Sequence, residues 1–260
     1  MIHFARRVAV ITVACIAAHA AGQVAAAAPA EPLYPGATVS KPLYGDPAHP
    51  DFSGVWVHDG SGRYWADPKQ SPPPLKPDYA IRHKGYEDAM EAGKPLADTA
   101  SECKALGFPR LLTGPDPIEI IQTPGQITFI QQSGHEVRRI FSDGRGHPED
   151  PDPSFDGHSI GHWEGTTLVV DTVALRADTI MDATGVPHSD ALHVTEKWHR
   201  VGDKLQIDAV AVDPKAFTKP WSTTHVLKRM PRDYEMMEDV CEDNNRNPTQ
   251  SDGTTTTITK

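Results

Sequence analysis

Residues 143–172 (DGRGHPEDPDPSFDGHSIGHWEGTTLVVDT) concentrate the ionisable chemistry of this chain. They hold three histidines, His147, His158 and His162, together with seven acidic residues. A histidine titrates near neutral pH, and a carboxylate bonded to one ring nitrogen orients the ring and raises its basicity. The leading hypothesis is therefore acid–base chemistry of the lyase or isomerase type, without a cofactor.

Candidate pairs are His162 with Asp171 or Glu196, and His188 with Asp190, while Arg139 is expected to hold a developing oxyanion or a substrate carboxylate. The full set of expected catalytic residues is His158, His162, Asp171, His188, His193, Glu196 and Arg139. A pocket for a small apolar or aromatic molecule is expected to be lined by Trp163, Trp198, Phe141 and His225. A non-catalytic carrier of the same kind of molecule is the first alternative.

The second alternative is a metal-dependent enzyme, because five histidines lie between residues 147 and 193. A zinc or iron site needs three or four such groups to converge. Their spacing fits no strong metal-binding motif, so the sequence predicts no metal ligands and no cofactor.

Two short motifs in this stretch imitate known sites. Gly157-His-Ser159-Ile-Gly161 has the Gly-x-Ser-x-Gly spacing of a hydrolase elbow, but a proline-rich loop enters it and a strand leaves it, where an elbow needs a strand and then a helix. Residues 152–157 begin like a calcium loop, yet the twelfth position is Trp163 where that loop needs a bidentate acid. Ser159 is accordingly interpreted as a strand-edge hydroxyl.

The N-terminal 30 residues have the composition of a secretory leader: Arg6 and Arg7, an apolar run, then alanine-rich sequence. The apolar run is shorter than the ~20 residues that span a bilayer, so no membrane insertion is expected. Removing this leader changes the net charge from −10 to −12, which disfavours nucleic acid as a partner. We expect a periplasmic or secreted protein.

Cys103 and Cys241 then remain as a pair in an oxidising compartment, which predicts a disulfide. Because 138 residues separate them, the chain-entropy model gives a stabilisation on the order of 4–5 kcal/mol. Two buried free thiols are the alternative.

Hydrophobic alternation with period two predicts a mainly β protein, an antiparallel lipocalin-like barrel with one short N-terminal helix that starts at Pro77 and ends before Gly93. Short strands separated by tight turns favour a meander that closes into a barrel. We expect a leader at 1–30, an extended proline-rich arm at 31–52, a barrel domain at 53–244 and a disordered tail at 245–260. The ten expected strands are 53–57, 118–121, 127–130, 137–141, 159–164, 167–172, 192–201, 205–212, 221–228 and 234–241.

Several blocks identify a resemblance to a large family of uncharacterised exported bacterial proteins, most specifically GHSIGHWEG followed by TLVVDT. The resemblance covers about residues 50–245. Gly54-Val-Trp56 also resembles the first-strand signature of lipocalin-like (calycin) barrels, in which the tryptophan plugs the closed end. These resemblances imply one exported barrel domain and supply no catalytic residues.

Overall fold

A computed structural model describes residues 49–60, 64–69, 71–241 and 250–255. The leader expected at 1–30 and most of the arm expected at 31–52 lie outside the described residues. Everything described here belongs to one compact unit, Pro42–Lys260.

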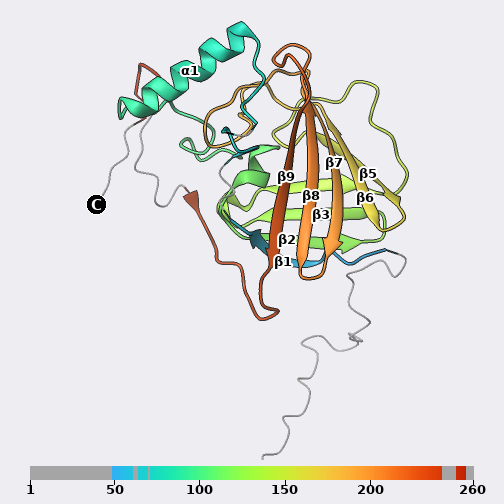
Figure 1. Cartoon of the computed structure of the whole chain (residues 1–260). Coiled ribbons are helices and arrows are strands. Elements are labelled where there is room, and N and C mark those ends of the chain that lie inside the picture. Colours follow the sequence, from blue (N-terminus) through green and yellow to red (C-terminus); the bar gives the residue numbers. More distant parts are fainter. Residues whose placement is uncertain (1–48, 61–63, 70, 242–249, 256–260) are drawn as a thin grey trace, which may run out of the picture. The chain divides into compact units, whose positions relative to one another are not determined.

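Nine strands of the described chain close into a barrel, and each pairs with its neighbour in sequence. This confirms the predicted mainly-β barrel, and the described residues before the barrel's second strand include the one predicted helix, α1. In Figure 1 the strands β7 to β9 cross β2 and β3 at a steep angle. The strands are β1 (Gly54–His58), β2 (Ile118–Thr123), β3 (Gln126–Gln131), β4 (Val137–Phe141), β5 (His158–Glu164), β6 (Thr167–Val173), β7 (His193–Val201), β8 (Lys204–Val212) and β9 (Trp221–Arg229).

One junction departs from the antiparallel pattern. Strands β4 and β5 pair in parallel, with Ile140 opposite Ser159 and Phe141 opposite Ile160. Parallel neighbours need a long crossover, and the connection between β4 and β5, residues 142–157, supplies it. This loop is the acidic, histidine-containing segment that the sequence singles out.

The predicted tenth strand, 234–241, is wrong. The segment does not enter the sheet. Gln132 Oε1 accepts its Met237 amide at 3.1 Å and its Tyr234 hydroxyl at 3.4 Å, and Asp239 accepts the Gly134 amide at 3.2 Å. The tail also differs from expectation over residues 250–255, where Thr254 forms a bridge with Leu96.

The barrel interior is a packed core. Buried positions alternate along strands such as β2 and β3, and Trp56, Phe129, Ile207 and Trp198 have essentially no exposed surface. Trp56 donates from Nε1 to the Phe52 carbonyl at 2.8 Å, which satisfies its one polar group while the ring fills the core.

The barrel has a seam beside its first strand. Strand β1 meets β9 over three residue pairs, from Trp56 with Arg229 to His58 with Leu227. Residues 221–225 of β9 pair with β8 on one side and with no described strand on the other. Segment 64–69, which follows β1 in the chain, lies beside this unpaired part of β9. The barrel wall is therefore completed there by a loop and its side chains.

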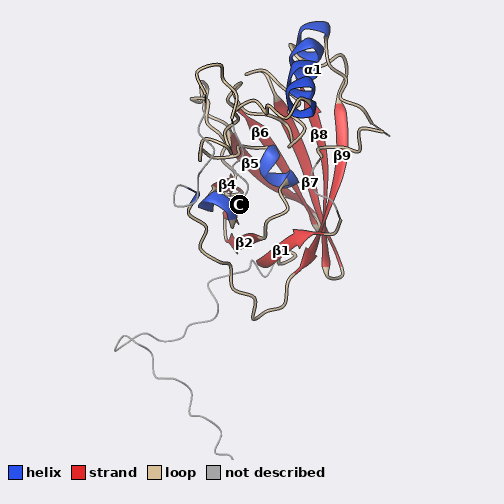
Figure 2. Cartoon of the chain, turned by 90° about the vertical axis from the view of Figure 1, so that its left-hand side faces the viewer, coloured by secondary structure: helices blue, strands red, loops and turns tan. Residues whose placement is uncertain are grey.

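Helix α1 (Pro77–Glu91) starts at a proline, whose missing amide hydrogen costs nothing in the first turn. It has no fully buried residue and packs on the loop between β6 and β7, at one end of the barrel (Figure 2). His83 Nε2 lies 3.2 Å from the Thr184 carbonyl oxygen. At Gly185, with φ +81°, an added Cβ would lie 2.1 Å from the Tyr86 ring, so only glycine fits there.

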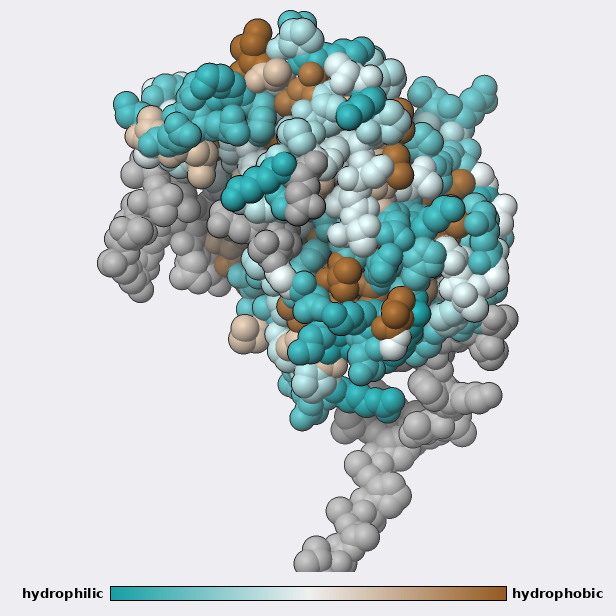
Figure 3. Space-filling view, in the orientation of Figure 1, coloured by the Kyte–Doolittle hydropathy of each residue, from teal (hydrophilic) through white to brown (hydrophobic). Residues whose placement is uncertain are grey.

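Cys103 and Cys241 form a disulfide, with their Cα atoms 5.5 Å apart. It joins the segment before β2 to the end of the chain segment that follows β9. The face seen in Figure 3 is largely hydrophilic with scattered hydrophobic residues. Within the described residues, no helix combines the length and the apolar character needed to cross a membrane.

Candidate functional site

The barrel core contains a buried ion pair. Arg138 on β4 donates to both carboxylate oxygens of Glu196 on β7, and both side chains have at most 1% of their surface exposed. The guanidinium also donates to Thr172 Oγ1 at 2.9 Å and to Ser159 Oγ at 3.2 Å. Trp198 Nε1 donates to Glu196 at 3.2 Å.

These contacts explain several expected site residues as core structure. Glu196 is held by Arg138 and Trp198, and no histidine contacts it among its described hydrogen bonds. Ser159 is bonded to Arg138 and to Thr172 and not to an imidazole, unlike a hydrolase nucleophile. Arg139, the expected oxyanion holder, is on the opposite, exposed face of β4.

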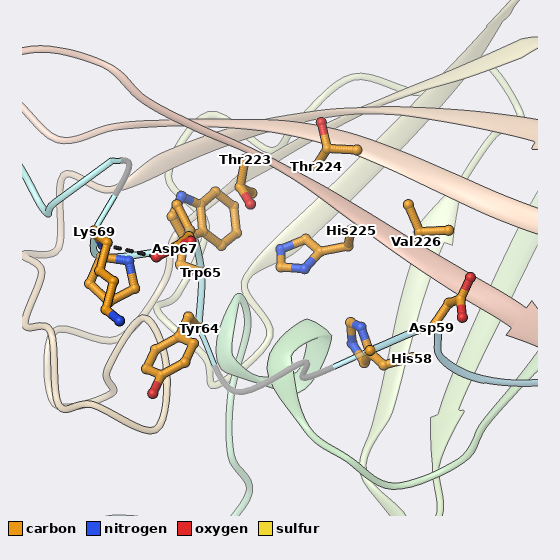
Figure 4. A pocket seen from close by; sticks show the side chains of 13 residues that line it. His58, Asp59, Tyr64, Trp65, Asp67, Lys69, Thr223, Thr224, His225 and Val226 are labelled. Atoms are coloured by element: carbon orange, nitrogen blue, oxygen red, sulfur yellow. Dashed lines mark hydrogen bonds between the residues drawn. The ribbon is translucent and has the colours of Figure 1, made fainter.

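A cavity of about 450 Å³ opens at the seam beside β9. Its wall combines the end of β1, residues 223–226 of β9 and segment 64–69. Figure 4 shows His225, His58, Trp65 and Tyr64 around one space, with Lys69 and Asp67 on one side of it and Asp59 on the other. This volume lies in the lower part of the range for small-molecule sites.

His225 is the unusual group in this wall. It is 5% exposed, and its Nε2 has no hydrogen-bond partner among the described residues. Burial, followed by the proximity of His58, lowers the pKa of His225 to about 3. The ring is therefore neutral at physiological pH and offers one N–H and one lone pair.

His58 is neutral too, and its tautomer can be deduced. Its Nε2 is hydrogen-bonded to the Leu112 carbonyl oxygen, which can only accept, so Nε2 carries the hydrogen and Nδ1 the lone pair. Burial lowers the pKa of His58, against the opposing effect of that hydrogen bond. The two imidazoles meet edge-on with centroids 5.7 Å apart, and Trp65 meets His225 similarly at 5.6 Å.

The charged groups of the cavity wall largely balance. Asp59 is ion-paired with Lys204, whose hydrogen bond lowers the pKa of that carboxyl, so Asp59 is ionised and neutralised. Asp67 accepts the backbone N–H of Lys69 at 2.9 Å, and the Lys69 ammonium is the compensating cation of the wall. The cavity thus has aromatic and neutral hydrogen-bonding walls and little net charge.

A second cluster lies on the outer face of β5, β6 and β7. Asp171 Oδ2 accepts from His147 Nε2 at 3.0 Å, and Asp171 Oδ1 is bonded to His193 Nε2. His147 Nδ1 in turn lies 2.7 Å from His158 Nδ1. Partial burial works to raise the pKa of Asp171, but the hydrogen bonds from His193 and His147 prevail and lower it.

The proton positions in this cluster follow from the carboxylate. Because ionised Asp171 only accepts, His147 carries its hydrogen on Nε2 and accepts at Nδ1 in the neutral state. His158 then donates from Nδ1, which leaves a lone pair on its Nε2. Burial, with His147 and Arg145 nearby, lowers the pKa of His158. Asp171, His147 and His158 therefore form a continuous hydrogen-bonded chain that ends in an unprotonated ring nitrogen, Nε2 of His158.

The remaining expected residues do not join either cluster. His162 is exposed and lies 3.3 Å from Glu164, not from Asp171. His188 is fully buried between Thr179 Oγ1 (2.8 Å) and the Ser189 carbonyl (2.9 Å), while Asp190 pairs with Lys215 instead.

The aromatic residues expected around a ligand lie apart from the seam cavity. Trp163 stacks on Phe52 with centroids 5.5 Å apart, and Trp198 packs in the core beside Phe129. Phe141 stacks on His158 at the outer cluster. His225 is the expected ligand-binding residue that the structure places at the cavity.

A buried carboxyl pair ties the crossover loop to the barrel. Glu136, 8% exposed, accepts the amides of Leu106 and Gly107, both at 2.7 Å. Burial and the neighbouring Asp156 carboxyl raise the pKa of Glu136 to about 8, and burial also raises the pKa of Asp156. At neutral pH the pair shares a proton.

Sequence reasoning missed His58, Trp65 and Arg138, and it counted His147 among the histidines of 143–172 without placing it in the expected catalytic set. Two of these have a signal in strand alternation: His58 is two residues after the buried Trp56, and Arg138 is two before Ile140, so each shares an inward face. Trp65 and His147 are in loops, where no periodicity places a side chain.

Within the described residues, no group of three or more His, Cys, Asp or Glu side chains is arranged to hold a metal ion. No protein-family model matches the chain, and no curated protein is significantly similar to it. The resemblance to exported bacterial proteins therefore stays a prediction.

Proposed function

We propose that this protein is an exported binding protein for a small molecule, which it holds in the seam cavity beside β9. The main support is the state of His225. It is a buried and neutral imidazole at the cavity wall, and its Nε2 has no hydrogen-bond partner among the described residues. A buried polar atom left without a hydrogen bond costs about 1–3 kcal/mol. A ligand that bonds this ring would recover that cost.

The same properties favour binding over catalysis at this site. A general acid or base works best when its pKa lies near the operating pH. His225, with a pKa of about 3, is far from that condition, and burial also lowers the pKa of His58. The carrier hypothesis therefore fits the cavity better than the lyase or isomerase hypothesis.

Filling the cavity tests this proposal. Thr223 lines the cavity, whereas its neighbour on β9, Ser222, is exposed and is not one of the lining residues. Protein purified from its own host should release a bound small molecule in native mass spectrometry. Thr223→Phe should lose this adduct and the Ser222→Phe control should keep it; equal retention by both variants would reject the cavity as the site.

The outer cluster supports a second candidate, acid–base catalysis of the lyase or isomerase type. Its specific observation is the hydrogen-bonded chain from Asp171 through His147 to His158. An enzyme of this type would catalyse proton exchange between water and a carbon acid, which NMR detects as deuterium incorporation. Activity lost in His158→Gln and kept in His162→Gln would support it; no exchange across a panel of small carbonyl compounds would reject it.

A further inference from the structure

The charge of the seam cavity limits what it can hold. Both imidazoles are kept neutral by burial, Asp59 is ion-paired with Lys204, and Lys69 lies beside Asp67. With a pKa of about 3, roughly one His225 ring in 10⁴ is protonated at pH 7. An anion entering this wall would find Lys69 as its one cationic partner among the lining residues and would lose its hydration.

The hydrogen-bonding groups of the cavity wall further restrict which neutral ligands fit. Neutral His58 has its lone pair on Nδ1, and His225 brings one donor and one acceptor. Thr223 points to the same side of β9 as His225 (Figure 4). A ligand hydroxyl both donates and accepts, so it can satisfy an imidazole in either tautomer.

The apolar part of the wall is aromatic. Trp65 has no exposed surface, and its ring is tilted 64° from the His225 ring. Tyr64 stands at the same side of the cavity. Aromatic walls at these angles accommodate a planar ring by stacking or by edge-to-face contact.

We infer that the seam cavity binds a neutral aromatic compound that carries a hydroxyl group, a phenol in chemical class, with the hydroxyl on His225 and the ring against Tyr64. This inference rests on the proposed binding function. Sites that bond a buried hydroxyl discriminate strongly against the analogue that lacks it, because the protein group is then left unpaired.

Three probes with the same ring test this: 4-ethylphenol, 4-ethylanisole and 4-ethylbenzoate, titrated by calorimetry into the full chain. The phenol should bind at least about tenfold more tightly than the methyl ether and the carboxylate. His225→Phe should remove that preference, and the exposed His162→Phe should keep it.

A methyl ether or carboxylate that binds as tightly as the phenol would overturn the inference, and so would a protein that binds none of the three. The proposed function is judged separately by the native adduct and its loss in Thr223→Phe. An adduct of another chemical class would refute the phenol and leave the binding function standing.

Discussion

Two of the places where the barrel buries polar side chains, the Arg138–Glu196 pair and His225, differ in how hydrogen bonds satisfy them. Arg138 and Glu196 bond to each other, and further hydrogen bonds with Thr172, Ser159 and Trp198 satisfy their remaining polar atoms. His225 is equally buried, yet its Nε2 has no partner among the described residues. A satisfied buried group specifies structure, whereas an unsatisfied one at a cavity wall marks where a ligand can supply the missing bond.

The largest expected effect on stability comes from breaking the buried Arg138–Glu196 pair. Arg138→Ala leaves Glu196 as an unpaired buried charge, which should lower the free energy of unfolding by about 3–5 kcal/mol. Arg139→Ala, on the exposed face of the same strand, should change it by less than about 0.5 kcal/mol. Urea titrations measure both; similar values for the two variants would contradict the structural role of the pair.

Lowering the pH should reveal the contribution of the unsatisfied His225 to the stability of the protein. The folded-state pKa of His225, about 3, lies below its unfolded value near 6.5, so the unfolded chain binds the extra proton between these pH values. Stability from this group is present above pH 6.5 and is lost as pH falls toward 3, by about 2–3 kcal/mol between pH 6 and pH 4.

His225→Phe should remove that part of the acid sensitivity, measured as the difference in unfolding free energy between variant and wild type. At pH 7 the same variant should be as stable as the wild type or slightly more stable, because an unpaired nitrogen is replaced by an apolar ring. A constant difference from pH 7 to pH 4 would show that His225 is not buried as a neutral ring.

The carboxyl pair that anchors the crossover loop should respond in the opposite direction. The pKa of Glu136 is raised to about 8, so the folded state keeps a proton that the unfolded chain releases above pH ~4.5. The stability contributed by this proton is complete below pH ~4.5 and falls as pH rises toward 8. Relative to Glu136→Gln, the wild type should lose about 2–3 kcal/mol between pH 5.5 and pH 7.5.

Glu149→Gln, an exposed position in the same crossover loop, is the control for this alkaline effect and should leave the pH profile unchanged. A wild-type profile parallel to that of Glu136→Gln would exclude the shared proton.

The smallest effect concerns the outer histidine cluster, which is partly exposed. His147→Ala should cost less than about 1 kcal/mol, since it removes surface hydrogen bonds to Asp171 and His158. Its clearer result should be local: faster amide hydrogen exchange in residues 142–157, which His162→Ala should not cause. Unchanged exchange would show that the cluster does not hold the loop.

Lowering the pH should have the same effect on the crossover loop as His147→Ala. The 2.7 Å contact between His147 and His158 needs one proton between the two Nδ1 atoms and cannot survive when both nitrogens are protonated. The pKa of His158 is lowered, so the second protonation occurs below pH 6.5. Loop exchange in the wild type should approach that of His147→Ala only under those acidic conditions.

Much of the architecture could be predicted because strand periodicity is local. The alternation in 118–141 and 192–228 gives the β-strands, and Pro77 gives the start of the helix. The error at 234–241 has the same origin, since a segment with alternating residues needs a neighbouring strand and this one meets the Gln132 side chain instead.

The sequence by itself determined that this chain forms a mainly β barrel, that Cys103 and Cys241 can pair, and that His225 lies on a strand face. Tertiary structure decided which partners the acidic groups find: Arg138 for Glu196, and two histidines from different segments for Asp171. Partners 58 and 24 residues apart become neighbours only through sheet register and the crossover loop. The seam cavity likewise exists because β1 is shorter than β9, and strand lengths become spatial gaps only when the barrel closes.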